Sequence, residues 1–285
     1  MKKILITGKN SYIGTHVKNW LKKDKKQYEV TELDVKTEEW LQEDFSKYDT
    51  ILHVAGIAHV STNKKLEDLY YKVNRDLAIQ VAQKAKNENV KQFIFMSSMI
   101  IYGDDENIGK IKIINKDTIP QPKNFYGNSK LQAEDGIKQL NDGNFRTVII
   151  RTPMVYGPNC KGNFQKLKRI AKLSPIFPDI ENERSMIYID NLCEFIKQVI
   201  DNEKSGIFYP QNKEYVSTKQ IIQVMSDSMN KKTHFIKLFN PILKLMAKKV
   251  NLINKVFGTK IYAKDLSEKF DYVVIDNEES IRRSI

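Results

Sequence analysis

Short apolar runs alternate with helical repeats through the first half of the chain. Near-continuous apolar stretches predict strands at residues 3–7, 28–34, 50–56, 92–98 and 146–151. Strands this apolar are typical of parallel sheets that are buried on both faces. Apolar residues at helical spacing predict helices at residues 12–21, 73–90 and 126–140. This alternation predicts an α/β fold with a doubly wound parallel sheet.

The second half has shorter and more mixed elements. Helices are expected at residues 164–173, 191–200 and 218–229, and strands at 185–189 and 206–209. We predict a sheet domain over residues 1–155, joined by part of 185–210, and a smaller interleaved lobe over 156–285. Residues 241–257 place Ile242, Leu245 and Met246 between lysines. A packed helix with a solvated lysine face is favoured there, and a helix lying on a membrane surface is the alternative.

Composition excludes several classes of protein. The chain has 285 residues, of which 41% are hydrophobic, so it is long enough to bury a core. The first apolar run ends at Thr7 and Gly8, too early for a secretion signal, and eighteen consecutive apolar residues occur nowhere. Cys160 and Cys193 lack the spacing of a metal site or a redox pair. We therefore expect a cytoplasmic protein with no metal and no integral membrane segment.

The net charge of +12 suggests a nucleic-acid partner, but the kind of basic residue argues against one. Lysine supplies 40 of the 47 basic residues, and the lysines are scattered along the chain. Nucleic-acid surfaces gather positive charge on one face and rely more on arginine. We expect no nucleic-acid binding, and the excess charge is compatible with an anionic substrate.

A glycine-containing turn joins the first predicted strand to the first predicted helix. This turn, TGKNSYIG, contains Gly8, Ser11, Tyr12, Ile13 and Gly14. Amides at a helix N-terminus attract a pyrophosphate, and glycines let the backbone approach it closely. Serine replaces the usual middle glycine, and its small size should be tolerated. The turn predicts a dinucleotide site of the Rossmann type.

The residue that follows the second strand bears on which dinucleotide binds. Asp34 lies about 20 residues beyond the turn, where a carboxylate can bind ribose hydroxyls. Lys9 and Lys36 are near enough in sequence to accept a 2′-phosphate instead. The cofactor is thus NAD or NADP, with NAD slightly favoured by Asp34.

Three Y-x-x-x-K spacings occur, so spacing alone does not identify a catalytic pair. They are Tyr126 with Lys130, Tyr209 with Lys213, and Tyr215 with Lys219. Tyr126 begins a long helix in the sheet half, where residues four apart share a face. Ser98 ends the fourth strand and is expected near this pair. We predict Ser98, Tyr126 and Lys130 as the catalytic residues.

The chemistry of this trio is that of an acid and base. An ammonium about 4 Å from a phenol is worth about 4 kcal/mol at an effective dielectric near 20. That interaction would lower the pKa of Tyr126 from about 10 to near 7, where general acid catalysis is efficient. Ser98 would hold the substrate oxygen. A dinucleotide-binding sensor without turnover is the alternative from another class of protein.

Together these residues resemble the extended short-chain dehydrogenase/reductase family, in its nucleotide-sugar branch. TGKNSYIG is similar to the family's TGxxGxIG, YGNSK to its YxxSK, and RTPMVYGP to its RxxxVYGP. The resemblance assigns Ala55, Gly56 and Asn74 to the cofactor, beside Tyr126 and Lys130. It implies that Arg184, in ERSMIYIDN, contacts the substrate diphosphate. Asn163 follows the VYGP strand and is an expected substrate contact by adjacency.

The resemblance implies a reaction at carbon 4 of a UDP-linked hexose or N-acetylhexose. A 4-keto reductase of capsule or O-antigen sugar synthesis is favoured, and a 4-epimerase with tightly bound NAD is the alternative. Met99 and Ile100 replace the acidic pair of the dehydratases, and Met154 replaces an asparagine of many epimerases. The family often dimerises through the helices beside the tyrosine, so a homodimer is possible. His53 and His59 are expected to be packing residues.

Overall fold

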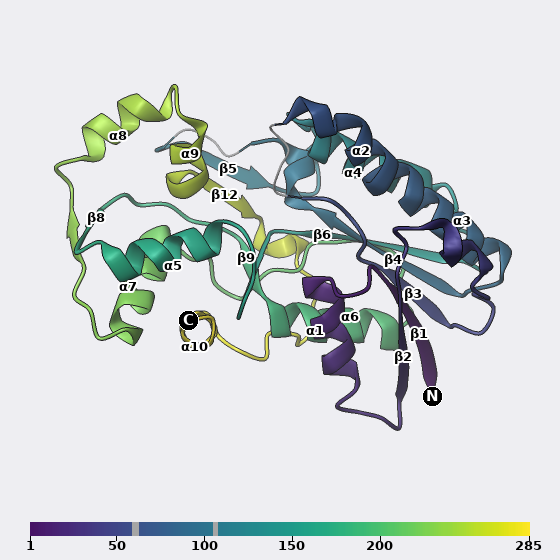
Figure 1. The fold of residues 1–285 in the computed structure, drawn as a ribbon. Coiled ribbons are helices and arrows are strands. Elements are labelled where there is room, and N and C mark those ends of the chain that lie inside the picture. Colours follow the sequence, from purple (N-terminus) through teal and green to yellow (C-terminus); the bar gives the residue numbers. More distant parts are fainter. Residues whose placement is uncertain (59–62, 105–107) are drawn as a thin grey trace.

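The computed structural model describes residues 1–58, 63–104 and 108–285 of the chain, so His59 lies outside the described residues (Figure 1). A six-stranded sheet with every pairing parallel has the order β10-β6-β4-β3-β1-β2. Its strands are β1 (Lys2–Thr7), β2 (Tyr28–Leu33), β3 (Thr50–His53), β4 (Gln92–Ser98), β6 (Arg146–Thr152) and β10 (Gly206–Phe208). The predicted doubly wound Rossmann arrangement is confirmed.

Helices cover both faces of this sheet (Figure 1). One face carries α2 (Glu67–Tyr71), α3 (Leu77–Asn87) and α4 (Phe125–Lys138), and the other carries α1 (Tyr12–Leu21) and α6 (Ile189–Asp201). Along β1, Leu5 packs toward α3, whereas Ile4 and Ile6 pack toward α1 and α6. Alternate residues of a strand point to opposite faces, so this apolar run fills both cores.

The remaining elements form a second group, called here the C-terminal lobe. Its helices are α5 (Asn163–Leu173), α7 (Thr218–Ser228), α8 (Asn240–Ala247), α9 (Asn251–Phe257) and α10 (Asn277–Arg283). Three parallel strand pairs complete it, namely β7 (Met154–Tyr156) with β9 (Met186–Tyr188), β8 (Ile176–Pro178) with β11 (His234–Ile236), and β5 (Ile111–Ile114) with β12 (Thr259–Tyr262). Short 3-10 helices span Glu38–Gln42, Lys64–Leu66, Met99–Tyr102 and Lys264–Leu266, and one π-helical segment spans Lys72–Asp76.

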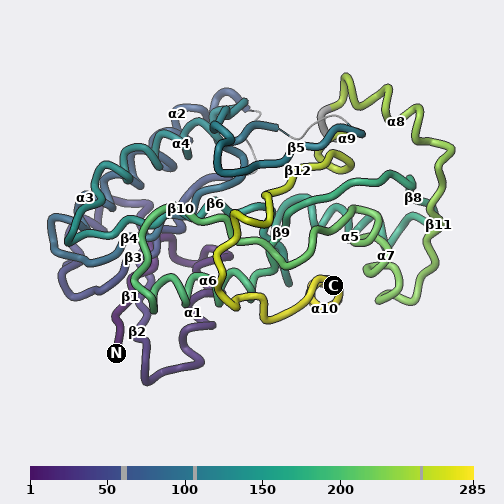
Figure 2. Tube along the Cα trace, turned by 180° about the vertical axis from the view of Figure 1, so that it is seen from behind, coloured from purple at the N-terminus to yellow at the C-terminus, as the bar shows by residue number. Residues whose placement is uncertain are grey.

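The chain passes between the two groups several times. After the lobe begins, α6 and β10 return to the sheet domain, where β10 pairs with β6. The yellow segment between β12 and α10 then crosses back over α6, as Figure 2 shows. There Phe195 of α6 packs against Phe270 and Tyr272 at centroid distances of 5.7 and 5.0 Å. These crossings bury apolar surface between segments far apart in sequence.

The structure differs from the predicted elements at two places. Between the predicted strand at 92–98 and the predicted helix at 126–140 the chain contains β5, a strand that the sequence analysis did not predict and that pairs with the distant β12. The predicted helix over 241–257 is divided into α8 and α9 at residues 248–250. Nothing within either segment indicates these features, because one depends on a partner strand and the other on packing. No helix in the described part of the chain is long and apolar enough to cross a membrane.

Candidate active site

The carboxyl ends of the parallel strands meet at one edge of the sheet, and the predicted site residues follow them. The chain reverses its direction of travel across the sheet between β1 and β3, which is where ligands of such folds bind. Gly8 follows β1 with φ of +102°, and a Cβ there would lie 2.8 Å from the amide nitrogen of Ala55. Only glycine permits this conformation and this approach without strain.

The rest of the turn begins helix α1. Ser11 is the N-cap, and its hydroxyl accepts a hydrogen bond from the Gly14 amide at 3.2 Å. Serine therefore caps the helix as well as being small enough for the turn. A Cβ on Gly14 would lie 2.6 Å from that hydroxyl oxygen. The side chains of Tyr12 and Ile13 pack against the core. These two residues would therefore contact a phosphate through their backbone amides.

Asp34 is exposed directly beyond β2, beside this turn. The amides of Gly8 and Lys9 both donate to the Leu33 carbonyl, at 3.0 and 3.2 Å, which fixes Asp34 close to the turn. One Asp34 oxygen accepts from the Lys36 amide at 3.0 Å. The carboxylate has the position expected of a ribose ligand, and Lys9 and Lys36 are both exposed beside it.

The loop after β3 lies between the glycine turn and helix α4. A Cβ on Gly56 would lie 3.0 Å from Asn74 Oδ1 and 3.4 Å from Lys130 Nζ. Asn74 is fully buried, accepts from the Ile57 amide at 2.8 Å and donates to the Ile57 carbonyl at 3.0 Å. Asn74 therefore holds this loop in place. The glycine cradle and the exposed helix terminus fit a dinucleotide.

Ser98 and Tyr126 come together at the end of β4. Asn124 caps helix α4 by accepting from the Gly127 amide at 2.9 Å, which makes Tyr126 a first-turn residue. A Cβ on Gly127 would lie 3.0 Å from the Ile100 carbonyl oxygen, so glycine lets this turn pack on the segment after Ser98. Ser98 lies near the phenol of Tyr126 and acts to lower the pKa of that phenol. The ring of Tyr70 lies edge-on to Tyr126 at 5.8 Å.

The pKa of Tyr126 moves opposite to the sequence-based expectation. Burial raises the pKa of Tyr126 to about 12, and the interaction with Ser98 only partly opposes this rise. The expectation that Lys130 lowers the pKa of Tyr126 to near 7 is wrong for the protein without a bound cofactor. The Lys130 ammonium is directed at the Met96 carbonyl, 2.8 Å away. Tyr126 is thus a neutral phenol at pH 7, ready to donate a proton.

Lys130 is buried under the end of β4, with 6% of its surface exposed. Its ammonium lies 4.4 Å from the centroid of the Phe95 ring. Burial lowers the pKa of Lys130 to about 8, although the charge of Glu134 acts in the opposite direction. The lysine therefore retains its charge at neutral pH and loses it near pH 8.

This shift predicts a pH-dependent stability. The unfolded chain keeps the Lys130 proton up to about pH 10.5, whereas the folded chain releases it near pH 8. Stability relative to a Lys130→Met variant should therefore increase by about 3 kcal/mol as pH rises from 8 to 10.5. Urea unfolding of both proteins at several pH values measures this difference. A difference that stays constant with pH would show that Lys130 titrates normally.

A buried ion pair beside the trio was not predicted. Glu134 lies one turn after Lys130, is fully buried, and receives Nε and Nη2 of Arg151 at 3.1 and 2.6 Å. Ser97 also donates to Glu134, and Arg151 Nη1 donates to the hydroxyls of Tyr102 and Tyr209 at 2.5 and 3.1 Å. An arginine at the end of an apolar strand signals a buried counter-charge. The sequence does not identify which acid supplies it.

Three further residues named in the sequence analysis, Tyr209, Tyr215 and His53, make contacts that serve the fold. Tyr209 contacts Arg151, and the Tyr215 hydroxyl donates to the Tyr262 carbonyl at 2.7 Å. His53 is fully buried between Phe93 and Phe95, with Nδ1 2.8 Å from the Thr7 hydroxyl. Burial lowers the pKa of His53 to about 3, so its ring is neutral and packs as expected.

The two predicted substrate contacts lie in the C-terminal lobe. Asn163 is the first residue of α5, after Gly162 with φ of +99°. Arg184 Nη1 donates to the carbonyls of Lys255 and Gly258 at 2.9 and 3.2 Å, which ties it to the end of α9. These two residues stay predicted substrate contacts. No group of three histidine, cysteine or carboxylate side chains suited to a metal occurs over the described ranges.

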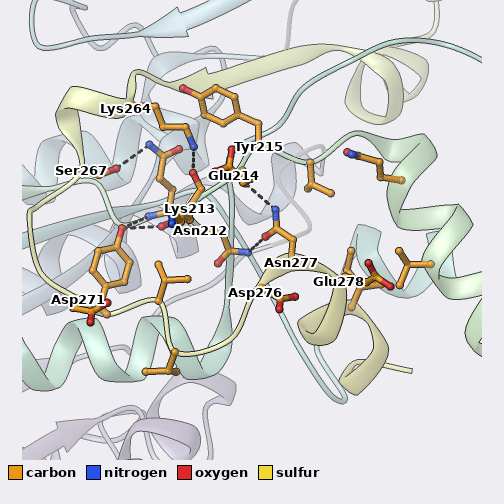
Figure 3. A pocket seen from close by; sticks show the side chains of 18 of the residues that line it. Asn212, Lys213, Glu214, Tyr215, Lys264, Ser267, Asp271, Asp276, Asn277 and Glu278 are labelled. Atoms are coloured by element: carbon orange, nitrogen blue, oxygen red, sulfur yellow. Dashed lines mark hydrogen bonds between the residues drawn. The ribbon is translucent and has the colours of Figure 1, made fainter.

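Two cavities of about 840 and 830 Å³ lie in the C-terminal lobe and not around Tyr126. Figure 3 shows the first, between the chain after β10, α7 and the segment that leads to α10. Asn277 spans it, donating to the Glu214 carbonyl at 2.9 Å and accepting from Asn212 at 2.7 Å. Arg184 and Asn163 line neither cavity, so neither cavity is assigned to the substrate on these contacts.

The fold and the glycine turn are those of an NAD(P)-dependent enzyme. A model of the NAD dependent epimerase/dehydratase family matches residues 4–216. The chain is 29% identical to a UDP-glucose 4-epimerase of Vibrio cholerae, covering 90% of this chain and 86% of that protein. It is 27% identical to the N-acetyl-alpha-D-glucosaminyl-diphospho-ditrans,octacis-undecaprenol 4-epimerase of Escherichia coli O157:H7, covering 90% and 81%. The protein belongs to the NAD-dependent epimerase/dehydratase family.

Solved structures share the fold. The Bacillus cereus UDP-glucuronic acid 4-epimerase, in complex with UDP-glucuronic acid and NAD, superimposes with a TM-score of 0.72 at 20% identity, covering 99% of this chain and 97% of that one. A Bacillus anthracis dTDP-4-dehydrorhamnose reductase in complex with NADP has a TM-score of 0.66 at 21% identity, covering 83% and 84%. The predicted family resemblance and the NAD(P) cofactor are confirmed.

Proposed function

We propose that this protein is a 4-epimerase of a UDP-linked hexose or N-acetylhexosamine. The observation that carries the proposal is the meeting of Ser98, Tyr126 and Lys130 at the sheet edge that also carries the glycine turn. Relatives that match nine-tenths of the chain are 4-epimerases by name, which supports epimerisation over the reduction that the sequence favoured. The UDP carrier, with Asn163 and Arg184 as its contacts, is part of the proposal.

The chain's own groups would move the proton and fix the sugar. A bound nicotinamide would supply the hydride acceptor and donor for carbon 4. Tyr126 would exchange a proton with the oxygen on that carbon, and Ser98 would hold this oxygen by a hydrogen bond. The neutral phenol is ready for the step that restores a hydroxyl. The opposite step needs the phenolate, which nearby positive charge stabilises. Lys130, one turn further along α4, would supply that charge once its ammonium turns from the Met96 carbonyl toward the phenol.

A 4-keto reductase is the second candidate function. The raised pKa of Tyr126 favours it, because a reductase needs this residue only as a proton donor. Met154, where many epimerases are expected to place an asparagine, also favours it. Dehydration is not proposed, since Met99 beside Ser98 is buried and carries no carboxylate. A homodimer through the helices beside Tyr126 remains a prediction.

One pair of incubations distinguishes these functions. Purified protein is given UDP-N-acetylglucosamine or UDP-glucose without added cofactor, and the products are separated by chromatography. We expect the C4 epimers to form. In a parallel incubation, a UDP-4-keto-6-deoxy-N-acetylhexosamine with NADH or NADPH would lose nicotinamide absorbance stoichiometrically if the protein is a reductase. Inactivity in both incubations, with NAD bound, would contradict both candidates and favour a sensor.

A further inference from the structure

An exposed apolar surface surrounds helix α8. Its residues are Leu238, Phe239, Ile242, Leu245 and Met246, which are 78, 43, 58, 68 and 46% exposed, and they are called here the α8 patch. Helix α8 lies at the outer rim of the C-terminal lobe in both views (Figures 1 and 2). Adjacent exposed apolar side chains of this size are uncommon on a soluble monomer and indicate an interaction surface.

Helix α8 is apolar on two sides, and in the part of the chain that the structure describes only the inner side is packed. Leu243 packs against the core and Ala247 is 3% exposed, so this inner face anchors α8 to the lobe. Ile242, Leu245 and Met246, which are spaced three and four residues apart, form a second side that is exposed. The outward face is therefore held in position by the fold and is not part of the core.

The chain segment that carries the α8 patch has charge of one sign, although Asp179, Glu181 and Glu183 from another segment line the cavity on its inner side. From residue 228 to residue 264 the chain has nine lysines and no acidic residue. Lys237, Lys244, Lys248 and Lys249 flank the patch and are exposed. Apolar side chains bordered by lysines fit the interface of an anionic membrane, where the apolar groups enter the acyl boundary and the ammonium groups contact phosphates.

We infer that the α8 patch docks the protein on the surface of an anionic phospholipid bilayer. The helix would lie in the plane of the interface, with Ile242 and Leu245 inserted and Lys248 and Lys249 at the headgroups. Lys237 and Lys244 also line the cavity of about 830 Å³ in this lobe. Docking through α8 therefore places that cavity next to the membrane.

Vesicle cosedimentation of the full chain tests this inference without any substrate. We expect the protein to sediment with mixed phosphatidylcholine and phosphatidylglycerol vesicles, and to be released by high salt because exposed charges are screened. Lys248→Gln with Lys249→Gln should weaken binding about thirtyfold, the equivalent of about 1 kcal/mol for each lysine. Ile242→Ser with Leu245→Ser should weaken it at least about tenfold, because less apolar area enters the interface.

Matched variants control for charge and exposed apolar area. Lys25→Gln with Lys26→Gln removes the same charge from an exposed turn, and Leu41→Ser with Ile119→Ser removes apolar side chains that are 47 and 75% exposed. Both controls should bind vesicles as the wild type does. Absence of binding to the mixed vesicles, or equal binding to phosphatidylcholine alone, would overturn the inference. So would a vesicle-free dimer that the Ile242 and Leu245 changes dissociate, since a second copy would then cover the patch.

Discussion

Tyr126→Phe should lower kcat about a thousandfold while the protein stays folded. A general acid or base contributes about 10² to 10⁴ in rate, and removing the hydroxyl removes the group that exchanges the proton. The ring remains in its pocket beside Tyr70, so NAD affinity and the thermal unfolding temperature should change little. The measurements are steady-state turnover, NAD titration and a thermal melt of each protein.

Tyr28→Phe is the matched control for this experiment. Tyr28 begins β2, and its hydroxyl donates to Asp201 at 2.6 Å, at the opposite end of the sheet from the site. Its loss should leave kcat within about twofold, since this hydrogen bond lies far from the site and contributes only about 1 kcal/mol of stability. Equal turnover of Tyr126→Phe and the wild type would remove the phenol from the mechanism and leave a dinucleotide-binding sensor.

Arg151→Met should destabilise the protein by about 3 to 5 kcal/mol. The change leaves the Glu134 carboxylate buried without its bidentate partner, and removing one member of a buried pair has about this cost. The Tyr102 and Tyr209 hydroxyls lose their shared contact as well. Urea unfolding measures the difference.

An exposed ion pair provides the comparison. Arg283 Nε contacts Glu279 at 2.7 Å with both side chains about half exposed, and Arg283→Met should cost less than about 1 kcal/mol. Replacing both Arg151 and Glu134 with apolar residues should recover part of the lost stability, because no buried charge then remains unpaired. A cost below 1 kcal/mol for Arg151→Met alone would show that Glu134 finds another partner.

Arg151, which pairs with Glu134 of α4, also connects this helix to the C-terminal lobe. Tyr262 of β12 donates to the Arg151 carbonyl at 2.9 Å, and Lys260 of the same strand donates to the Gly103 carbonyl at 2.5 Å. Strand β12 therefore contacts both the end of β6 and the segment after Ser98. Movement of the C-terminal lobe would therefore shift the end of β6 and the segment after Ser98 through these two hydrogen bonds.

The positions of Gly8, Ser98, Tyr126 and Lys130 follow from the sequence because each depends on local order along the chain. A strand ends, a glycine turn follows, and a helix begins; parallel strands then bring these ends to one edge. The pKa of Tyr126 could not be predicted from the sequence, because it depends on how deeply α4 packs and on where the Lys130 ammonium is directed. Those are properties of the assembled core.

The sequence by itself predicted the parallel sheet, the glycine turn after β1 and the placement of Ser98, Tyr126 and Lys130 at one edge, because periodicity and turn residues act over a few neighbours. Tertiary structure alone decided that Glu134 pairs with Arg151, that β5 pairs with β12, and that Ile242, Leu245 and Met246 of α8 are exposed. Each of these depends on which distant segment packs alongside. Such long-range pairing reflects the free energy of the whole fold, and no local pattern encodes it.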